Sequence, residues 1–526
     1  MSGERVGSWR VFWVVQSPVS GRRMAELVGG WSDWSAPRVD VGVRAGDPIF
    51  LSPEYRVDPV LSLFGQSGRF RRYTAETRRN YATDICLMLT FLSGRRRSWT
   101  DATARDLEDY EHWRRFAAEN PARIGGTKWN RELAAFASLY GWAVREGHVE
   151  RNPLALRQVV GRDGGACVIP VARAKDARRS NVHWLTPRTW RRWIDVGLRG
   201  HTRAGVPEAG WVGRLEDRNV AFVRLLTSSG LRRAEGGSLL TFEVPMRRLD
   251  GGRYYRGIIA AGVTRSKRTR TFYVGAEAVG EIEAYLHSSR AWAVRRAQGK
   301  EVYERLRQVR IVVEVTRGVR PVVRWRDREG VVGARALADL TVDERMLLFT
   351  EGPGGLEPLW LWLNERGLPL RPHSWEGVFA AANARCARVL TPPDRVGLDP
   401  YRVFAPYATP HSARNSFALY MLVVLDTLMD RRFGLTCEER RDFRQLYGDP
   451  WFMVQNLLGH ASRETTVDRY LAPVADLQLR AMLAGAAEPV TAPMPELDSV
   501  FARIARESVG IQDLDARMHP ETGGAW

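Results

Sequence analysis

The stretch WFMVQNLLGHASRETTVDRYL, residues 451–471, contains His460 and Tyr470 ten residues apart. Its apolar residues at 452, 454, 457 and 458 predict a buried helix, and Gly459 suits the left-handed end of that helix. The polar run that follows would leave Tyr470 on a separate short element. On this stretch alone Tyr470 could fill a core or carry chemistry, so its role depends on the groups that the rest of the chain brings to it.

Three upstream motifs supply cationic and imidazole side chains: GLRRAE at 230–235, SKRTR at 266–270 and PHSAR at 410–414. Thr409, just before the last motif, and Pro410, its first residue, predict a helix start, because threonine caps helices and proline fits the first helical position. His411 and Arg414 would then lie one turn apart at the positive end of that helix. A phosphate bound there would meet an imidazole, a guanidinium and backbone N–H groups together.

A second arginine has a similar setting. Arg232 lies at a predicted helix start, and Glu235 follows three residues later, where its carboxylate can hold the guanidinium in place. A phosphodiester attacked at phosphorus gathers charge on its non-bridging oxygens, and planar guanidinium forks neutralise that charge in fixed geometry. The motifs together therefore supply the side chains that a site for phosphodiester chemistry needs.

Lysine usage singles out Lys267. The chain has four lysines among 79 basic residues, and this one lies in the arginine-filled sequence RSKRTR. A guanidinium hardly releases a proton, whereas an ammonium surrounded by positive charge can, so a general acid in this motif would be the lysine. The alternative is that one of four lysines falls here by chance.

Composition limits the class of protein. A chain of 526 residues is long enough for two or more domains. Its net charge of +19 favours nucleic acid as a partner over a membrane surface, although a merely solvated arginine-rich surface would give the same count. The longest apolar run, 418–425, is far shorter than the roughly 20 residues of a membrane span and predicts a core helix.

The four cysteines lie far apart without a C-x-x-C pair, which argues against a disulfide framework and against a zinc site. The apolar patch near the N-terminus is interrupted by Arg10 and lacks a small-residue cleavage site, so we do not expect a secretory signal. These features favour a cytoplasmic protein.

Changes in pattern along the chain predict five regions. Residues 1–55 are an unassigned N-terminal arm, 56–160 a basic helical domain, 161–182 a Gly- and Arg-rich linker, 183–485 a second domain with insertions, and 486–526 an acidic tail. In the tail, Leu497, Phe501 and Ile504 form an apolar stripe that would pack either on a neighbouring protomer or back on its own domain.

The helices expected within 56–160 have capping residues and basic residues near their N-terminal ends. Thr74 or Thr77, Thr103 and Thr127 are the predicted caps of three helices. Near the helix starts lie the expected DNA contacts, which are Arg78, Arg79, Lys128 and Arg131. Further along, alternation around Lys267 predicts a β-hairpin, and residues 285–345 fit no single pattern.

The motifs GLRRAE, SKRTR, HSAR and LLGHASRETT, followed by Tyr470, stand in this order behind a basic helical region. Over about residues 70–480 the chain resembles the tyrosine recombinase (phage integrase) family. The resemblance implies a mainly α fold with a small β-sheet (α+β), in which a helical core-binding domain and a mixed catalytic domain clamp double-stranded DNA. It also implies a site-specific recombinase of mobile elements that needs neither metal nor ATP, has no cofactor, and works as a homotetramer on two DNA sites.

The resemblance also implies roles for individual residues. Tyr470 matches the nucleophile, Arg232 and Arg414 the phosphate-clamping arginines, Lys267 the general acid, His411 and His460 the proton-handling positions, and Glu235 the supporting acidic residue.

Two departures from the family pattern stand out. Asn415 replaces a frequent second histidine, and the intervals before His411 and before His460 are long enough to contain insertions. Two other functions stay open on the sequence alone. A type IB topoisomerase or a telomere-resolving enzyme uses similar groups, and a DNA-binding protein that has lost its chemistry would retain the charge.

Overall fold

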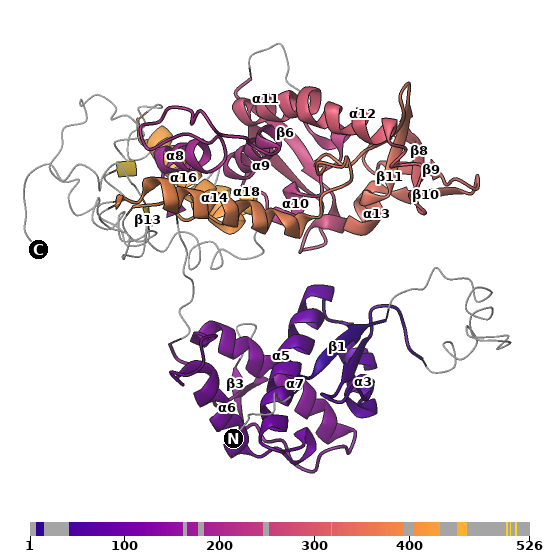
Figure 1. The fold of residues 1–526 in the computed structure, drawn as a ribbon, viewed down its shortest axis with the longest axis vertical. Helices are drawn as coiled ribbons and strands as arrows, with labels where there is room; N and C mark the ends of the chain where they lie inside the picture. Colours follow the sequence, from indigo (N-terminus) through magenta and orange to yellow (C-terminus); the bar gives the residue numbers. More distant parts are fainter. Residues whose placement is uncertain are drawn as a thin grey trace, which may run out of the picture. The chain divides into compact units, whose positions relative to one another are not determined.

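The computed structural model describes residues 7–14, 42–160, 166–176, 184–245, 252–316, 318–393, 404–431, 450–459, 501–502, 505 and 511–512. The chain divides into two compact units, residues 1–179 and 180–526, called here the N-terminal and the C-terminal unit (Figure 1). The described residues form many helices and several small sheets, so the expected α+β class is confirmed.

The N-terminal unit is mainly helical. Its described elements are β1 (Arg10–Trp13), β2 (Pro48–Leu51), α3 (Pro59–Gln66), α4 (Gly68–Arg71), α5 (Ala75–Gly94), η1 (Trp99–Asp101), α6 (Ala104–Arg115), α7 (Gly126–Arg145), β3 (Leu156–Val160) and β4 (Ala166–Pro170). The apolar faces of α5 and α7 are buried, with Ile85 and Met88 on one helix and Leu133 and Phe136 on the other. Burial of these faces holds the two long helices together.

Two of the three predicted helix caps in this unit are confirmed. Thr74 caps α5 by accepting the N–H of Thr77 at 3.2 Å, and Thr103 forms a capping box with Asp106 at the start of α6. The predicted cap at Thr127 is wrong. Helix α7 begins at Gly126 behind Gly125, so Thr127 already lies inside the first turn, whereas a capping side chain must precede it.

Residues before 56 contribute to the core of this unit. Strand β1 pairs antiparallel with β2, and the indole N–H of Trp9 donates to Ser93 Oγ in α5 at 2.7 Å. Phe50 is fully buried, and Asp47 accepts a hydrogen bond from Arg71 Nε at 3.0 Å. The described part of the predicted N-terminal arm is thus a structural layer on the helices.

The burial of Phe50 gives a first prediction. Phe50→Ala should lower the free energy of unfolding of the N-terminal unit by about 3–5 kcal/mol, because it leaves a cavity in the core. Phe12→Ala on the paired strand is the control: Phe12 is 52% exposed against 0% for Phe50, so its loss should cost about 0.5 kcal/mol or less. Urea unfolding of both full-length variants measures the difference, and equal losses would contradict the assignment of this layer to the core.

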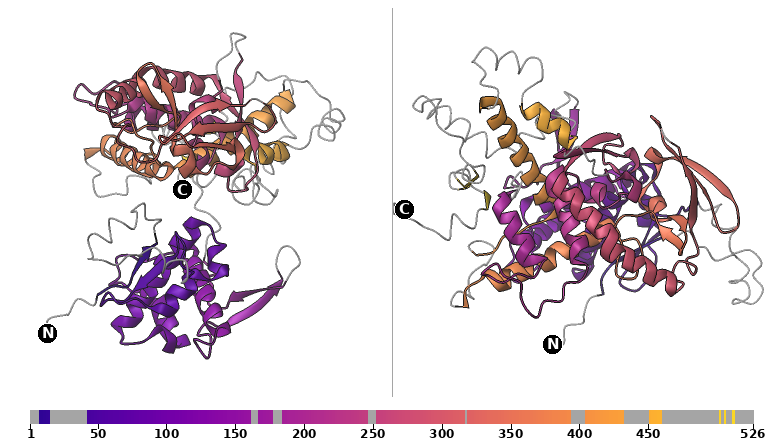
Figure 2. Two further views of the ribbon diagram at one scale, coloured as in Figure 1. Left: turned by 90° about the vertical axis from the view of Figure 1, so that its right-hand side faces the viewer. Right: turned by 90° about the horizontal axis from the view of Figure 1, so that it is seen from above.

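Part of the predicted linker is a strand. β3 and β4 pair antiparallel from Leu156 with Pro170 to Val160 with Ala166, and they extend away from the helices of their unit (Figure 2). Residues 166–170 of the predicted linker are therefore a strand of the N-terminal unit, while the division between the two units, after residue 179, falls inside the predicted range 161–182. A short strand gains its hydrogen bonds from a partner rather than from its own sequence, so the loss of helical periodicity did not distinguish the two states.

The C-terminal unit contains the remaining elements. They are β5 (Trp184–Leu185), α8 (Pro187–Gly197), α9 (Glu216–Ser229), α10 (Arg233–Gly236), η2 (Thr241–Glu243), β6 (Tyr254–Ile259), η3 (Ala261–Val263), β7 (Arg270–Gly275), α11 (Ala276–Tyr285), the π-helix η4 (Leu286–Arg290), α12 (Ala291–Gly299), β8 (Arg310–Val315), β9 (Val322–Arg326), β10 (Val332–Ala336), η5 (Leu337–Asp339), α13 (Val342–Met346), β11 (Leu348–Gly352), β12 (Gly355–Pro358), η6 (Pro372–Ser374), α14 (Trp375–Leu390), α16 (Pro410–Arg431), α18 (Pro450–Leu458) and β13 (Ile511–Gln512). The predicted hairpin is confirmed as β6 and β7, with Ile259 opposite Arg270.

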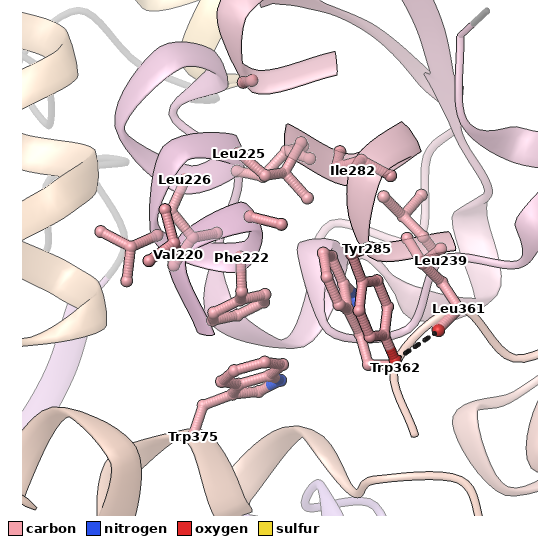
Figure 3. Packing of buried hydrophobic residues seen from close by; sticks show 14 of the residues in the cluster. Val220, Phe222, Leu225, Leu226, Leu239, Ile282, Tyr285, Leu361, Trp362 and Trp375 are labelled. Carbon is pink, nitrogen blue, oxygen red and sulfur yellow. Dashed lines mark hydrogen bonds between the residues drawn. The ribbon is translucent and has the colours of Figure 1, made fainter. Parts of the chain in front are cut away.

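An aromatic core fixes the helices of this unit. Phe222 of α9 stacks on Trp375 of α14 with ring centroids 3.6 Å apart, and Tyr285 of α11 stacks on Trp362 at 5.5 Å (Figure 3). The hydroxyl of Tyr285 donates to the Leu361 carbonyl at 3.3 Å, so its polar atom is satisfied in the core. This packing holds the C-terminal end of α9, which leads into GLRRAE.

Residues 285–345, which fit no sequence pattern, contribute to a five-stranded sheet in the order β10-β9-β8-β11-β12. The sheet and α12 lie at the end of the unit away from α16 and α18 (Figures 1 and 2). Strand β8 pairs antiparallel with β9 inside the stretch and parallel with β11, so one of its two partners comes from beyond the unassigned stretch. Such non-local pairing leaves no periodic signal in the sequence.

The C-terminal tail is described at only a few residues. Phe501 is buried, and its ring stacks on Tyr420 of α16 with centroids 5.9 Å apart, while β13 pairs parallel with β5. This part of the apolar stripe therefore packs on the chain's own unit, whereas Leu497 and Ile504 lie outside the described residues. Within the described segments, every helix is too short or too polar to cross a bilayer.

Candidate active site

Glu235 is the centre of a cluster of arginines. It lies in α10, is 1% exposed, and accepts the backbone N–H of Arg232 at 2.9 Å and Arg232 Nη1 at 3.0 Å. Its other ion pair is with Arg270 at the start of β7, whose Nη2 lies 2.6 Å from Oε2. One buried carboxylate therefore holds two guanidinium groups that lie 38 residues apart in the chain.

The charges around Glu235 decide its ionisation. Burial alone raises the pKa of this carboxyl, but the charges of Arg270, Arg414 and Arg232, with the N–H of Arg232, outweigh burial and lower the pKa below its ordinary value of 4.5. The stabilisation from the ionised form is therefore fully present above pH 4.5 and is lost only as the pH falls through the lowered value. At neutral pH the carboxylate is charged and able to bind both arginines.

Arg414 connects three elements. It lies in the second turn of α16, whose start is capped by Thr409 Oγ1 accepting the N–H of Ser412 at 3.1 Å. The Arg414 side chain is fully buried, and its two Nη atoms donate to the backbone carbonyls of Gly230 and Leu458. Gly230 ends α9, and Leu458 ends α18, so this arginine holds two helix ends together.

A second arginine binds the same end of α18. Arg270 Nη1 donates to the carbonyl of Leu457 at 3.1 Å, next to the Leu458 carbonyl that Arg414 binds. The last carbonyls of a helix have no partner within it, and cations are favoured at that end by the helix dipole. Gly459 follows with a φ of +65°, which is the left-handed end expected from the sequence.

These contacts bring four distant segments to one place. The segments are GLRRAE through Arg232 and Glu235, SKRTR through Arg270, PHSAR through Arg414, and the helix of WFMVQNLLG through its last carbonyls. Two of the contacts join residues 184 and 187 positions apart. Four segments that lie far apart in the sequence are thus in direct contact in the described part of the chain.

The other residues predicted for the site lie in less constrained positions. Lys267 is exposed, has a φ of +53°, and its Nζ donates to the Gly262 carbonyl at 3.3 Å. His411 is exposed in the first turn of α16. His460 and Tyr470 lie outside the described residues.

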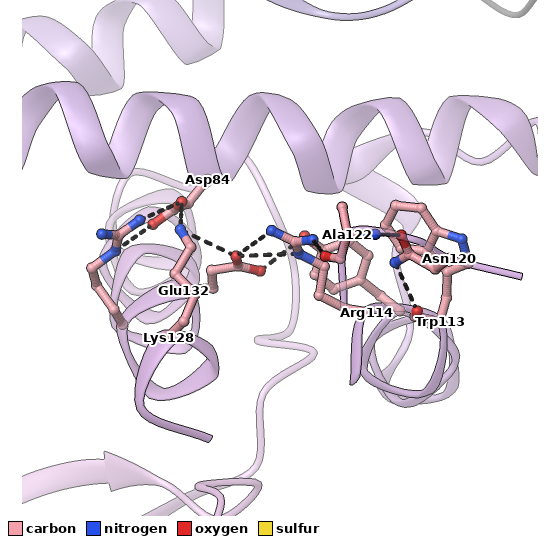
Figure 4. A network of polar contacts seen from close by, with 9 residues as sticks. Asp84, Trp113, Arg114, Asn120, Ala122, Lys128 and Glu132 are labelled. Atoms are coloured by element: carbon pink, nitrogen blue, oxygen red, sulfur yellow. Dashed lines mark hydrogen bonds and ion pairs between the residues drawn. The ribbon is translucent and has the colours of Figure 1, made fainter. Parts of the chain in front are cut away.

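Two of the basic residues predicted to contact DNA are paired inside the protein. Lys128 forms ion pairs with Asp84 and, at 3.2 Å, with Glu132, while Arg131 binds Asp84 at 3.1 Å (Figure 4). Both carboxylates are buried. A phosphate that bound Lys128 or Arg131 would therefore compete with these carboxylates for the positive charge.

The other two basic residues lie on the first turns of α5. Arg78 is half-buried and donates to the Gly46 carbonyl at 2.9 Å. Arg79 is exposed, and its guanidinium forms no hydrogen bond or ion pair with a residue that the structure describes. Of the four predicted contacts, Arg79 offers its charge to solvent most directly.

Sequence reasoning assigned no role to Arg270, although it lies in the motif SKRTR. The lysine of that motif was selected for its chemistry, whereas the arginine three residues later is the one that contacts Glu235. The carboxylate of Glu235 offered a signal, because its two oxygens can accept more hydrogen bonds than the side chain and N–H of Arg232 supply. A further donor was therefore to be expected. Which of the neighbouring arginines fills that place depends on the register of β7.

The end of α18 gives a second prediction. Gly459→Ala should destabilise the C-terminal unit by about 1–2 kcal/mol, because a side chain disfavours positive φ. The added Cβ would also lie 2.7 Å from Arg270 Cδ. The same change at Gly377 in α14, where the Cβ meets nothing within 4 Å, should instead stabilise by about 0.5–1 kcal/mol. Thermal unfolding of both variants measures the opposite signs, and a stabilised Gly459→Ala protein would contradict the left-handed end.

Comparison with known proteins connects the N-terminal unit to a family. Residues 69–147, which include α5, α6 and α7, match the model of the phage integrase N-terminal SAM-like domain. A search of curated proteins gives no match.

Two solved structures are similar at low identity. The XerH site-specific recombinase bound to palindromic difH substrate, in a post-cleavage complex, is 12% identical over 81% of this chain and 86% of that chain, with a TM-score of 0.37. The integrase from mycobacterium phage Brujita is 14% identical over 76% of this chain and 91% of that chain, with a TM-score of 0.19. The match over residues 69–147 agrees with the resemblance found in the motifs: this part of the chain is similar to the N-terminal SAM-like domain of phage integrases.

Proposed function

We propose that this protein is a site-specific DNA recombinase that cleaves and rejoins DNA through a 3′-phosphotyrosyl intermediate. The observation that carries the proposal is the convergence of four segments on Glu235, Arg232, Arg270 and Arg414. The arginines around this buried carboxylate, next to the helix that leads to Tyr470, provide the fixed positive charge that phosphoryl transfer requires.

In the proposed reaction the phenolic oxygen of Tyr470 attacks the scissile phosphorus. The new phosphorus–oxygen bond forms as the bond to the 5′-oxygen breaks, leaving a 3′-phosphotyrosyl link and a free 5′-hydroxyl. Lys267 donates a proton to the leaving 5′-oxygen, and His411 and His460 handle the proton of the tyrosine and hydrogen-bond the phosphate. The link conserves the phosphodiester energy, so rejoining requires neither ATP nor a metal ion.

The two clamping arginines differ in access. The side chain of Arg232 is 30% exposed, so a phosphate oxygen can reach its guanidinium while Glu235 holds it in place. Arg414 is fully buried behind the end of α18, so a direct contact with phosphate would require that end to shift. Without such a shift, Arg414 serves the site by holding Gly230, two residues before Arg232.

The proposed partner is double-stranded DNA, bound by a homotetramer on two sites. A net charge of +19 favours association with phosphates, and Arg79 presents an exposed guanidinium near the start of a helix in the SAM-like domain. Phosphate contacts of this kind position a duplex but do not select its sequence, so the target site must be found experimentally.

Covalent trapping tests the proposal. The full-length protein is incubated with a pool of nicked duplexes of randomised sequence, and adducts that survive detergent are digested with nuclease and trypsin. We expect mass spectrometry to find a nucleotide on the peptide YLAPVADLQLR, residues 470–480, whose only tyrosine is Tyr470. Attachment at another residue, or no adduct with any duplex, would overturn the proposal, and relaxation of supercoiled plasmid without a preferred site would favour a topoisomerase instead.

A further inference from the structure

Arg270 uses its guanidinium to join two parts of the C-terminal unit. Nη2 binds Glu235 Oε2 at 2.6 Å, and Nη1 binds the Leu457 carbonyl at 3.1 Å. Its side chain is 11% exposed, and its Nε is buried without an acceptor among the residues that the structure describes. A side chain so enclosed, with each terminal nitrogen on a different element, is placed to fix geometry rather than to attract DNA from solvent.

The two arginines at the end of α18 hold it to different partners. Arg414 joins the Leu458 carbonyl to Gly230, whereas Arg270 joins the Leu457 carbonyl to Glu235. Because Glu235 in turn binds Arg232 Nη1 at 3.0 Å, a continuous path of polar contacts runs from the end of α18 to the partly exposed Arg232. The first residue beyond that end and its glycine is His460, and Tyr470 follows ten residues later.

Glycine at 459 fits the same arrangement. A Cβ at this position would lie 2.7 Å from Arg270 Cδ and 3.0 Å from Nε, so the turn at Gly459 packs directly against the side chain of this arginine. The backbone hydrogen bond from the Gly459 N–H to the Asn456 carbonyl, 3.0 Å long, closes the turn. The direction in which the chain leaves α18 is thus set while it is in contact with Arg270.

From these contacts we infer that Arg270 is a positioning residue for the strand-cleavage step. It holds the end of α18, up to Gly459, at a fixed place relative to Arg232, and His460 and Tyr470 follow that end in the sequence. This inference rests on the proposed function. A displacement of about 1 Å at a reacting group can cost about 100-fold in rate, so loss of Arg270 should reduce cleavage by about that factor while the DNA-binding surface is retained.

The test compares Arg270→Met, which keeps the length of the side chain, with Arg256→Met on the neighbouring strand. Arg256 is exposed, and its guanidinium contact with a described residue is a 3.4 Å hydrogen bond to Thr271, so it is a matched control. Three quantities are measured on the full-length proteins: affinity for a random-sequence duplex, single-turnover adduct formation at saturating duplex, and amide hydrogen exchange of peptides covering 450–459.

For Arg270→Met we expect unchanged DNA affinity, about 100-fold slower adduct formation and faster exchange at the end of α18. Arg270→Lys, which keeps the charge but lacks the planar fork that offers a separate nitrogen to Glu235 and to Leu457, should give intermediate values. Arg256→Met should match the wild type in all three. If Arg270→Met does not fold, the same three measurements are made on Arg270→Lys and on Gly459→Ala, whose added Cβ would lie 2.7 Å from Arg270 Cδ.

The outcomes separate this inference from the proposed function. Adduct formation at the wild-type rate by Arg270→Met, or unchanged exchange over 450–459, overturns the positioning role. Affinity and rate that fall together also overturn it, since they indicate a general loss of structure. If the wild type forms no adduct at all, the proposed function fails, and exchange alone then decides whether Arg270 holds α18: faster exchange supports that hold and unchanged exchange refutes it.

Discussion

Tyr470→Phe is expected to abolish the covalent protein–DNA adduct while leaving DNA affinity unchanged. The phenyl ring keeps the packing of the side chain but removes the only oxygen that could form the phosphotyrosyl bond. In well-studied hydrolases whose catalytic residues act as a unit, loss of the nucleophile reduces turnover by about 10⁶-fold. We expect the rate of adduct formation to fall by a factor of that order here.

The measurement is adduct formation on duplexes selected by the wild-type protein, with binding measured in parallel on the same duplexes. Tyr254→Phe is the matched control, because Tyr254 is exposed on β6 and has no role in the proposed reaction. An adduct of normal yield with Tyr470→Phe would transfer the role of nucleophile to another residue. Loss of affinity together with the adduct would mean that Tyr470 is needed for structure or binding.

Glu235→Ala is the second change expected to have a large effect. It removes the buried carboxylate that pairs with Arg232 and Arg270 and leaves the Arg270 guanidinium enclosed without its anionic partner. Removing one member of a buried ion pair costs about 3–5 kcal/mol of stability. We therefore expect a loss of that size in the C-terminal unit, accompanied by loss of adduct formation because Arg232 is no longer held.

A surface ion pair provides the control for this change. Glu314 pairs with Arg324 at 3.2 Å, and both side chains are more than half exposed. Glu314→Ala should cost at most about 1 kcal/mol, since solvent screens the pair. Urea unfolding of the two full-length variants measures the difference, and a cost for Glu235→Ala no larger than that of the control would refute a structural role of the arginine cluster.

Local features of the fold were predictable from short stretches of sequence. Thr74 and Thr103 cap their helices, and Gly459 ends α18 in the left-handed conformation, because caps and helix ends depend on a few neighbouring residues. The hairpin of β6 and β7 followed from alternation. Thr127 failed as a cap because the helix begins two residues too early, a detail that propensity does not resolve.

Elements that depend on distant partners were not predictable in this way. β8 pairs with β11 from beyond the unassigned stretch, and β4 gains its hydrogen bonds from β3 across the predicted linker. The same holds for the cores, since Phe50 lies in a region without a recognisable pattern and yet is fully buried. Burial and pairing of short strands are decided by what lies opposite them.

The residue types of the candidate site and their order along the chain can be read from the sequence alone, because the chemistry of arginine, lysine, histidine and tyrosine belongs to the side chains. How the cations are used depends on the fold. It joined Arg270 to Glu235, buried Arg414 between two helix ends, and paired Lys128 with Asp84. An arginine free in the unfolded chain has no preferred partner, and a specific pair forms only when folding brings a carboxylate or a helix end to it and removes the competing water.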